Sequence, residues 1–292
     1  MFQTLPTPTL VQLSQGSAEW LGYRRSRFNA SESAAVLGLN PWQTPYQLWL
    51  DKTGKSQTRP NAAMLRGTEL EPLARAAYEQ ETGLVMQPVV LEAGNYSASL
   101  DGMTLEGDLV LEIKCPMRGA ESDLWQSVCA GQLPAHYQVQ VQHQLMVSGG
   151  TTAHLWVFDG SRGLLLEIGR DEGLMERIQS GWEAFAPFLD KDTPPPLSDR
   201  DARYRDDQAW REAASAFILL KQQSEALAQE LEVARQTLVA LAHHPKEYGA
   251  GVSVTQFWKL GSVDYKKIPQ LKGLDLSPYR GEARRETRVV LD

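Results

Sequence analysis

The chain of 292 residues has the apolar and aromatic content of a globular protein and a formal net charge of −7. This length fits one large domain, or a domain of about 200 residues with an extension. The negative charge argues against a protein that coats nucleic acid non-specifically, because attraction to phosphate dominates such binding. A nucleic-acid enzyme with a local basic channel remains compatible with it.

Three features indicate the compartment. No apolar run approaches the ~18 residues that cross a bilayer, and the first residues lack the basic start and apolar centre of a secretory signal. The two cysteines, Cys115 and Cys129, are too few for a disulfide framework or a four-cysteine metal cluster. We therefore expect a cytoplasmic protein with reduced thiols and no membrane association.

Helix and strand signals alternate along the first two thirds of the chain. Apolar residues at helical spacing predict helices, and short apolar runs between turn residues predict strands. The predicted helices cover residues 29–37, 44–50, 61–82, 134–147 and 171–190, and the predicted strands cover 84–91, 96–100, 109–114, 154–158 and 164–168.

The stretch Thr193–Pro196 is the clearest boundary in the chain, because its three prolines cannot continue a helix. It predicts a first domain at 1–192 and an extension at 193–292. In the extension, apolar residues recur every three or four positions from Phe217 to Leu241, which predicts a long coiled-coil-like helix that ends before Pro245, followed by a basic tail. The spacing fits an arm, an oligomer contact and a helix packed on the first domain equally well.

The stretch LEIKCP at 111–116 places a carboxylate and an ammonium two residues apart in an apolar strand. Side chains alternate faces along a strand, so Glu112 and Lys114 point one way while Leu111 and Ile113 point the other. A buried charge requires a partner or a metal ion. The pattern therefore indicates either a salt-bridged strand end or a working site.

Metal-assisted phosphodiester hydrolysis needs oxygen ligands for the metal ion, a group that places the attacking water, and positive charge beside the phosphorus. Asp101, Glu112 and Lys114 supply these elements if the turn at Glu106–Asp108 brings the two carboxylates together. The residues alone also allow a solvated strand face. Likewise Glu71, four residues before Arg75 on a predicted helix, fits an ordinary surface ion pair.

Four motifs together resemble one family. The stretches WLGYRRSRFNASESAAVLG (20–38), RGTELEPLARAAYEQETG (66–83), SLDGMTLEGDLVLEIKCP (99–116) and HYQVQVQHQLMVSG (136–149) are similar to motifs of the lambda-type, or YqaJ-like, phage recombination exonucleases, also called alkaline exonucleases. The resemblance covers about residues 15–190. It implies an α/β fold of the PD-(D/E)XK restriction-endonuclease-like type, a mixed central sheet flanked by helices, here with a C-terminal helical extension.

The resemblance also implies a catalytic site. Asp101, Glu112 and the backbone carbonyl of Ile113 would bind one or two Mg²⁺ ions, for which Mn²⁺ would substitute. Lys114 would orient or deprotonate the attacking water. Glu71 would complete the acidic site, and Gln140 would lie beside the water and the scissile phosphate. The sequence pattern alone would favour Gln140 as a polar residue on an exposed helix face.

A second group of residues matches the family's DNA-end contacts. Arg24, Ser31 and Ser99 correspond to positions that bind the terminal 5′-phosphate, with Arg25 and Arg27 as competitors for the arginine role. Met64 falls where the family has an apolar wedge that splays the terminal base pair, although an apolar residue there could equally belong to the core. The chain departs from the family where Leu100, and not proline, precedes Asp101; this difference removes no metal ligand.

The resemblance implies an Mg²⁺-dependent 5′-to-3′ exonuclease that digests linear double-stranded DNA, releases 5′-mononucleotides and leaves a 3′ single-stranded overhang. It further implies a homotrimeric ring around DNA and a single-strand annealing protein as partner in phage-type recombination. Two alternatives stay open: a structure-specific endonuclease or RecB-like nuclease module on the same fold, and a non-catalytic DNA-binding or assembly protein. A Cas4-like nuclease is excluded, because two cysteines cannot hold its iron–sulfur cluster.

Overall fold

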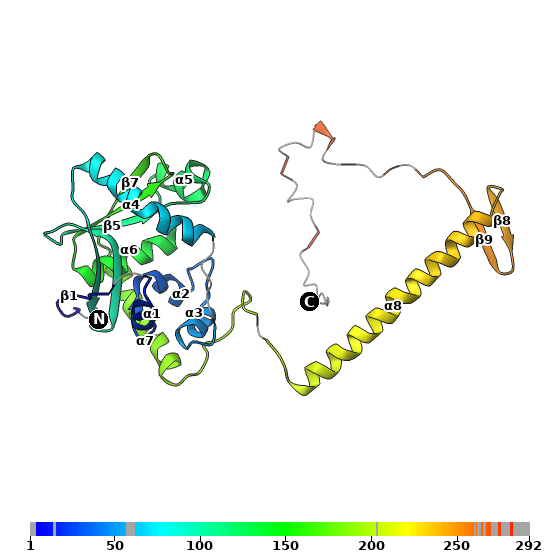
Figure 1. The fold of residues 1–292 in the computed structure, drawn as a ribbon, viewed down its shortest axis with the longest axis horizontal. Coiled ribbons are helices and arrows are strands. Elements are labelled where there is room, and N and C mark those ends of the chain that lie inside the picture. Colours follow the sequence, from blue (N-terminus) through cyan, green and yellow to red (C-terminus); the bar gives the residue numbers. More distant parts are fainter. Residues whose placement is uncertain are drawn as a thin grey trace. The chain divides into compact units, whose positions relative to one another are not determined.

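The computed structural model describes residues 4–13, 16–56, 62–202 and 204–259, and further along only 261, 264, 267–269, 274–275 and 281–282. It divides into two units, Met1–Ala202 and Arg203–Asp292, which are described separately. In the first unit a sheet lies between helices (Figure 1). The residues of the predicted basic tail lie largely outside the described residues.

The sheet of the first unit is mixed, as predicted. Its order is β1-β3-β4-β5-β6-β7, and β2 pairs with the start of β4. The pairs β5–β6 and β2–β4 are parallel, and the other pairs are antiparallel. The strands are β1 (Thr9–Leu10), β2 (Phe28–Asn29), β3 (Gln87–Ala93), β4 (Tyr96–Met103), β5 (Leu109–Lys114), β6 (Thr152–Phe158) and β7 (Gly163–Gly169).

Helices cover both faces of this sheet. One face packs against α4, and the other packs against α6, behind which lie α2 and α7. The five helices predicted from sequence are present, and two short helices, α1 and α5, were not predicted. The helical elements are α1 (Ala18–Arg25), η1 (Ala30–Glu32), α2 (Ser33–Val36), α3 (Pro45–Lys52), α4 (Ala62–Thr82), η2 (Gly119–Glu121), α5 (Asp123–Cys129), α6 (Ala135–Ser148) and α7 (Glu172–Asp190).

Strand β5 separates two apolar clusters, as the alternation of its side chains predicted. Leu111 and Ile113 pack with Tyr78 of α4, whereas Val110 packs in the larger cluster around α6. Glu112 therefore faces α6 although it is only 2% exposed. The apolar neighbours fix the register of β5, so they also determine where this carboxylate points.

Strand β4 is irregular at the position of Asp101. Leu100 pairs with Val89 and Met103 with Gln87, so that Asp101 and Gly102 together oppose the single residue Pro88 of β3. This is a β-bulge, a feature that re-aims side chains and is frequent beside active sites. Pro88 fits there because it has no N–H to contribute to the ladder.

On its other edge β4 has two partners in succession. Its start pairs with β2 up to Ser97, and its end pairs with β5 from Gly102 onward. In the described strand registers, the segment between these pairings has no strand partner on this edge. Strands β2 and β5 therefore diverge along this edge of β4 near Ser99–Asp101, and the sheet is open there beside the predicted site.

The second unit contains one long helix and a hairpin. Helix α8 (Gln208–Leu241) begins at an Asp207 N-cap and has no buried residue, and β8 (Lys246–Gly249) pairs antiparallel with β9 (Val252–Thr255). The long helix was predicted, but its apolar seam has no partner among the described residues of this unit. Of all the described helices, none is long and apolar enough to span a membrane.

Residues 193–202, the last of the first unit, contact the loop between α2 and α3. Arg200 donates hydrogen bonds to the carbonyl oxygens of Asn40 (2.9 Å) and Pro41 (3.0 Å), and Asp201 accepts one from the Thr44 hydroxyl. This segment therefore holds the loop between α2 and α3 in place.

Candidate active site

The carboxylate of Glu112 is the centre of a hydrogen-bond network between β5 and α6. Its Oε1 atom accepts from the Lys114 ammonium and from the Gln140 amide (2.7 Å for the latter), and its Oε2 atom accepts from the Gln144 amide. The two glutamines lie one helical turn apart, so both reach the same carboxylate from α6. Three donors thus converge on one buried carboxylate.

Asp101 lies across from Glu112 at the opening in the sheet. The pairing of Gly102 with Leu111 places Asp101 next to Glu112, and the Asp101 Oδ2 atom accepts a hydrogen bond from the backbone N–H of Ile113 (2.7 Å). The Asp101 side chain thus accepts a β5 backbone N–H just beyond the last β4–β5 backbone pair. The two carboxylates are brought together as the sequence predicted.

This arrangement raises the free energy of charged Asp101. Burial raises its pKa well above the ordinary value, and the neighbouring carboxylates of Glu112 and Glu71 raise it further, against the opposing effects of Lys114 and the Ile113 N–H. The apposition of like charges in a desolvated position is typical of functional carboxylates and of cation sites.

Lys114 is held as an ammonium ion. Burial by itself lowers its pKa, but the carboxylates of Glu112 and Asp101 outweigh burial and the pKa is raised. The ammonium also lies 5.4 Å from the centroid of the Tyr137 ring. In this state Lys114 donates hydrogen bonds and does not accept a proton.

Glu71 approaches the site from α4. Its Oε1 atom accepts a hydrogen bond from Arg75 (2.7 Å), so the surface-type i,i+4 pair considered from sequence does form. The carboxylate of Glu71 nevertheless lies close enough to raise the pKa of Asp101. Glu71 therefore forms the surface-type pair and also lies near Asp101.

Two of the three predicted phosphate ligands meet at the start of α2. Arg24 donates a hydrogen bond to the hydroxyl of Ser31 (2.8 Å) and lies 3.6 Å from a Glu32 carboxylate oxygen. Ser99 does not join them in the described hydrogen bonds, and its carbonyl oxygen instead accepts a bond from Gln144 (3.4 Å).

Lys52 and Asn29 hydrogen-bond to the backbone of the segment Arg24–Arg27. The buried ammonium of Lys52 binds Glu32 (2.7 Å) and donates to the carbonyl oxygens of Arg24 (3.1 Å) and Arg27 (2.6 Å). The Asn29 amide donates to the same carbonyl groups and to Glu32. This network fixes the backbone that carries the Arg24 side chain.

A groove of about 1090 Å³ connects these two groups of residues. Arg24 and Ser31 line one part of it, Lys114 and Gln140 line another, and Met64, which is 53% exposed, lies on the α4 side. The exposure of Met64 shows that this residue is not core. The groove is also lined by Trp42, His136 and Tyr137.

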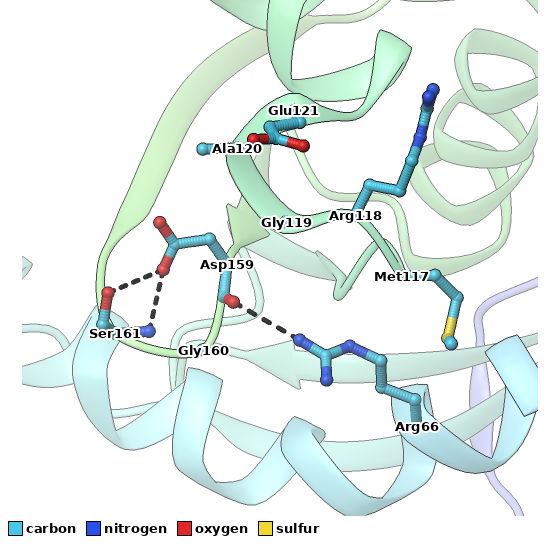
Figure 2. A pocket seen from close by; sticks show the side chains of 9 residues that line it. All are labelled: Arg66, Met117, Arg118, Gly119, Ala120, Glu121, Asp159, Gly160 and Ser161. Carbon is cyan, nitrogen blue, oxygen red and sulfur yellow. Dashed lines mark hydrogen bonds between the residues drawn. The ribbon is translucent and has the colours of Figure 1, made fainter.

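A second, shallower depression of about 570 Å³ lies between the start of α4, the loop after β5 and the β6–β7 turn (Figure 2). Its charged groups are satisfied locally: Arg66 donates to the Asp159 carbonyl oxygen (3.4 Å), the Asp159 carboxylate accepts from Ser161, and Arg118 pairs with Asp123. It contains none of the predicted site residues, and we assign no role to it.

The donor set is suited to Mg²⁺. Among the described residues no three carboxylate, imidazole or thiolate groups gather into a closed metal centre, but the paired carboxylates of Asp101 and Glu112 do meet. Mg²⁺ typically binds one or two carboxylates and completes its shell with water and substrate phosphate. The raised pKa of Asp101 marks a position where a cation would relieve like-charge repulsion.

Sequence reasoning missed Gln144, Lys52 and Asn29. Gln144 lies four residues after Gln140 in the HYQVQVQHQL stretch, and this spacing was a usable signal for a second amide on the same helix face. No comparable signal marks Lys52, because its partners are backbone carbonyl groups from a distant loop.

The mixed sheet flanked by helices, with Asp101 and the Glu112–Lys114 pair on adjacent strands, is the PD-(D/E)XK nuclease fold. The crystal structure of LHK-Exo in complex with dAMP matches with a TM-score of 0.53 and 28% identity over 61% of this chain and 94% of that chain. The crystal structure of the alkaline exonuclease LHK-Exo from Laribacter hongkongensis matches with a TM-score of 0.52 over the same shares, again at 28% identity.

Residues 19–151 match the YqaJ-like viral recombinase domain. The uncharacterized protein YqaJ of Bacillus subtilis (strain 168) is 29% identical over 284 residues, which cover 86% of each chain. That share exceeds the 202 of 292 residues in the first unit, so the similarity extends into the second unit. These matches confirm the predicted resemblance to YqaJ-like phage exonucleases.

Proposed function

We propose that this protein is an Mg²⁺-dependent exonuclease that digests linear double-stranded DNA from its 5′ end, releases 5′-mononucleotides and leaves a 3′ single-stranded overhang. The observation that carries the proposal is the groove that joins the acidic cluster, through Lys114 and Gln140, to Arg24 and Ser31. The similarity to the alkaline exonuclease LHK-Exo, whose crystal contains a deoxynucleoside monophosphate, supports it.

Asp101, Glu112 and the Ile113 carbonyl would hold the metal ion, with Glu71 completing the acidic site. When bound, Mg²⁺ supplies Lewis-acid activation and charge neutralisation at the scissile phosphate; Mn²⁺ would substitute for it, and the donor set accommodates one or two ions. The raised pKa of Lys114 supports a role as a donor that orients water and stabilises negative charge on the phosphate. Gln140 bonds Glu112 and faces the groove, where its amide would hold the reacting groups in line.

At the other part of the groove, Arg24 and Ser31 would bind the terminal 5′-phosphate. A guanidinium group and a hydroxyl at the start of a helical segment form a suitable anion site. Met64, exposed on α4, would act as the wedge at the terminal base pair. Ser99 would be a third ligand of the 5′-phosphate, as the resemblance to the family implies.

The proposal includes an assembly and a partner. A homotrimeric ring would enclose the DNA duplex, and a single-strand annealing protein would receive the 3′ overhang during phage-type recombination. The proposed place of action is the cytoplasm of a bacterial host, since the substrate is phage or host DNA. We propose residues 1–192 as the nuclease domain and 193–292 as an extension.

A time course with Mg²⁺ on linear duplex DNA tests the proposal, with 5′-phosphate and 5′-hydroxyl ends compared and a closed circle as control. We expect loss of the linear DNA alone, faster with the 5′-phosphate. Cutting of the circle would instead establish an endonuclease on the same fold. No cutting with Mg²⁺ or Mn²⁺ would indicate a non-catalytic DNA-binding protein.

A further inference from the structure

Three aromatic side chains form a cluster in the groove. The Tyr137 and His136 rings have centroids 4.1 Å apart, the His136 and Trp42 rings have centroids 4.9 Å apart at an interplanar angle of 84°, and the Trp42 and Tyr137 centroids are 6.4 Å apart. The cluster lies beside the active site, since the Lys114 ammonium is 5.4 Å from the centroid of the Tyr137 ring. None of these rings has a role in the proposed hydrolysis.

Trp42 is 70% exposed although it is the largest apolar side chain in the groove. Its loop is nonetheless fixed. The Asn40 side chain accepts hydrogen bonds from the backbone N–H groups of Trp42 (2.8 Å) and Gln43 (3.1 Å), and Arg200 binds two carbonyl groups of the same loop. An exposed indole on a fixed loop is a preformed contact surface.

The surroundings of the cluster indicate a ligand with both flat rings and phosphates. Arg24, Arg25 and Lys114 line the same groove. The carboxylates that also line it, Glu32 and Asp51, are bonded to Lys52 and Gln43. His136 contributes an uncharged ring at neutral pH, because burial and the nearby Lys114 lower its pKa. Aromatic rings between cationic groups are the usual arrangement for single-stranded nucleic acid, whose bases stack while its phosphates bind cations.

We propose that Trp42, His136 and Tyr137 form a stacking platform for unpaired bases at the 5′ end of the DNA strand that enters the groove. This inference rests on the proposed function and adds the residues that would receive the terminal bases once the wedge has separated them from the complementary strand. Stacking on the platform replaces stacking lost from the duplex, so the platform favours opening of the end.

A double-mutant cycle between protein and DNA tests the platform. Trp42→Ala is compared with the unsubstituted protein on 5′-phosphorylated duplexes that carry either normal nucleotides or abasic sites at the first two 5′ positions. We expect each single change to lower kcat/KM by about 10-fold, the order expected for one lost aromatic–base stack, and the two together to lower it by little more than either alone. Multiplication of the two effects, to about 100-fold, would show that Trp42 does not contact these bases.

Two further variants separate stacking from folding. Trp42→Phe keeps an aromatic face and should retain activity within about 3-fold, whereas Trp42→Ala should not. Leu105→Ala, an equally exposed apolar residue on the β4–β5 turn outside the groove, should leave kcat/KM unchanged. Full activity of Trp42→Ala would overturn the proposal. So would a change in the molecular mass of the Trp42→Ala protein in solution together with multiplicative effects in the cycle, because Trp42 would then be a contact between copies of the chain.

A binding measurement keeps the platform distinct from the nuclease function. A 5′-phosphorylated single strand with 2-aminopurine at its terminal position is titrated in chelator, where no cutting occurs. Quenching by the unsubstituted protein that is lost in Trp42→Ala supports the platform even if the protein proves unable to cut DNA. Equal quenching by both proteins would contradict it whatever the nuclease assay shows.

Discussion

The amide nitrogen of Gln144 donates a hydrogen bond to the carboxylate of Glu112, and neither residue is more than 2% exposed. Gln144 thereby fixes the one carboxylate oxygen that Lys114 and Gln140 do not contact. The orientation of Glu112 is set from both sides, by its strand and by α6. A carboxylate that has to meet a cation at a fixed position gains from such support.

We expect Gln144→Leu to lower nuclease turnover at least 10-fold and to reduce the free energy of unfolding by about 1–3 kcal/mol, since a charged acceptor loses a buried donor. Gln142→Leu is the matched control, because Gln142 is equally buried in α6 but bonds Gly169 and Asp171 away from the site. Initial rates and urea unfolding of both variants decide the matter. Equal loss of turnover in the two variants would show that Gln144 acts only through stability.

Lys114→Ala should retain DNA binding and lose at least ~100-fold in rate, which is typical for removal of one electrostatic or general acid–base group. Single-turnover rates and a binding titration in chelator separate the two properties. Lys55→Ala, which removes an exposed lysine paired with Asp192, serves as control and should cut DNA normally. Turnover near that of the unsubstituted protein would reject the assignment of Lys114.

In chelator, Asp101→Asn should be more stable than the unsubstituted protein. The substitution removes one of two adjacent carboxylate charges, and the amide oxygen still accepts the Ile113 N–H bond. Mg²⁺ at about 100 times its dissociation constant should stabilise the unsubstituted protein by about 2.7 kcal/mol and leave Asp101→Asn unchanged. Thermal unfolding with and without Mg²⁺ measures both effects.

Glu106→Gln is the control for this experiment, because Glu106 is an exposed acid in the turn between the same two strands. Its response to Mg²⁺ should equal that of the unsubstituted protein. Equal stabilisation of Asp101→Asn and the unsubstituted protein by Mg²⁺ would place the cation elsewhere.

Lys52→Met should reduce the free energy of unfolding by about 3 kcal/mol, because it leaves Glu32 without its buried partner. It should also weaken the preference for 5′-phosphorylated ends, since Glu32 would then compete for Arg24. The double variant Lys52→Met/Glu32→Gln should recover part of the stability. If the single and double variants are equally unstable, the carbonyl contacts of Lys52 matter more than its ion pair.

His143 makes the first unit sensitive to acid. Burial lowers its pKa to about 3, below the ordinary value of about 6.5. Above pH 6.5 the imidazole is neutral in both states; between pH 6.5 and 3 only the unfolded chain binds the proton, so stability falls as the pH falls. The loss at pH 5 is about 2 kcal/mol.

Urea unfolding at pH 7 and pH 5 tests this dependence, with His143→Gln as the comparison. The variant should lose about 2 kcal/mol less than the unsubstituted protein between the two pH values, even if it is less stable at both. An identical loss in the two proteins would assign the acid sensitivity to other groups.

The sequence alone determined the elements that depend on local patterns and the identity of the acidic pair. The apolar alternation of 109–114 predicted β5 and the faces of Glu112 and Lys114, and the helical stripe at 61–82 predicted α4, because each signal is contained in one element. The four motifs predicted the family and the fold. The short α1 and α5 were missed.

Only the tertiary structure decided how the elements meet. The bulge opposite Pro88 and the separate pairings of β4 with β2 and with β5 open the sheet beside Asp101, and they depend on where distant segments pair. The same holds for Gln144 beneath Glu112, for Lys52 beneath Arg24 and for Trp42 beside His136. Such contacts follow from where whole elements pack, and no spacing along a single helix or strand encodes that position.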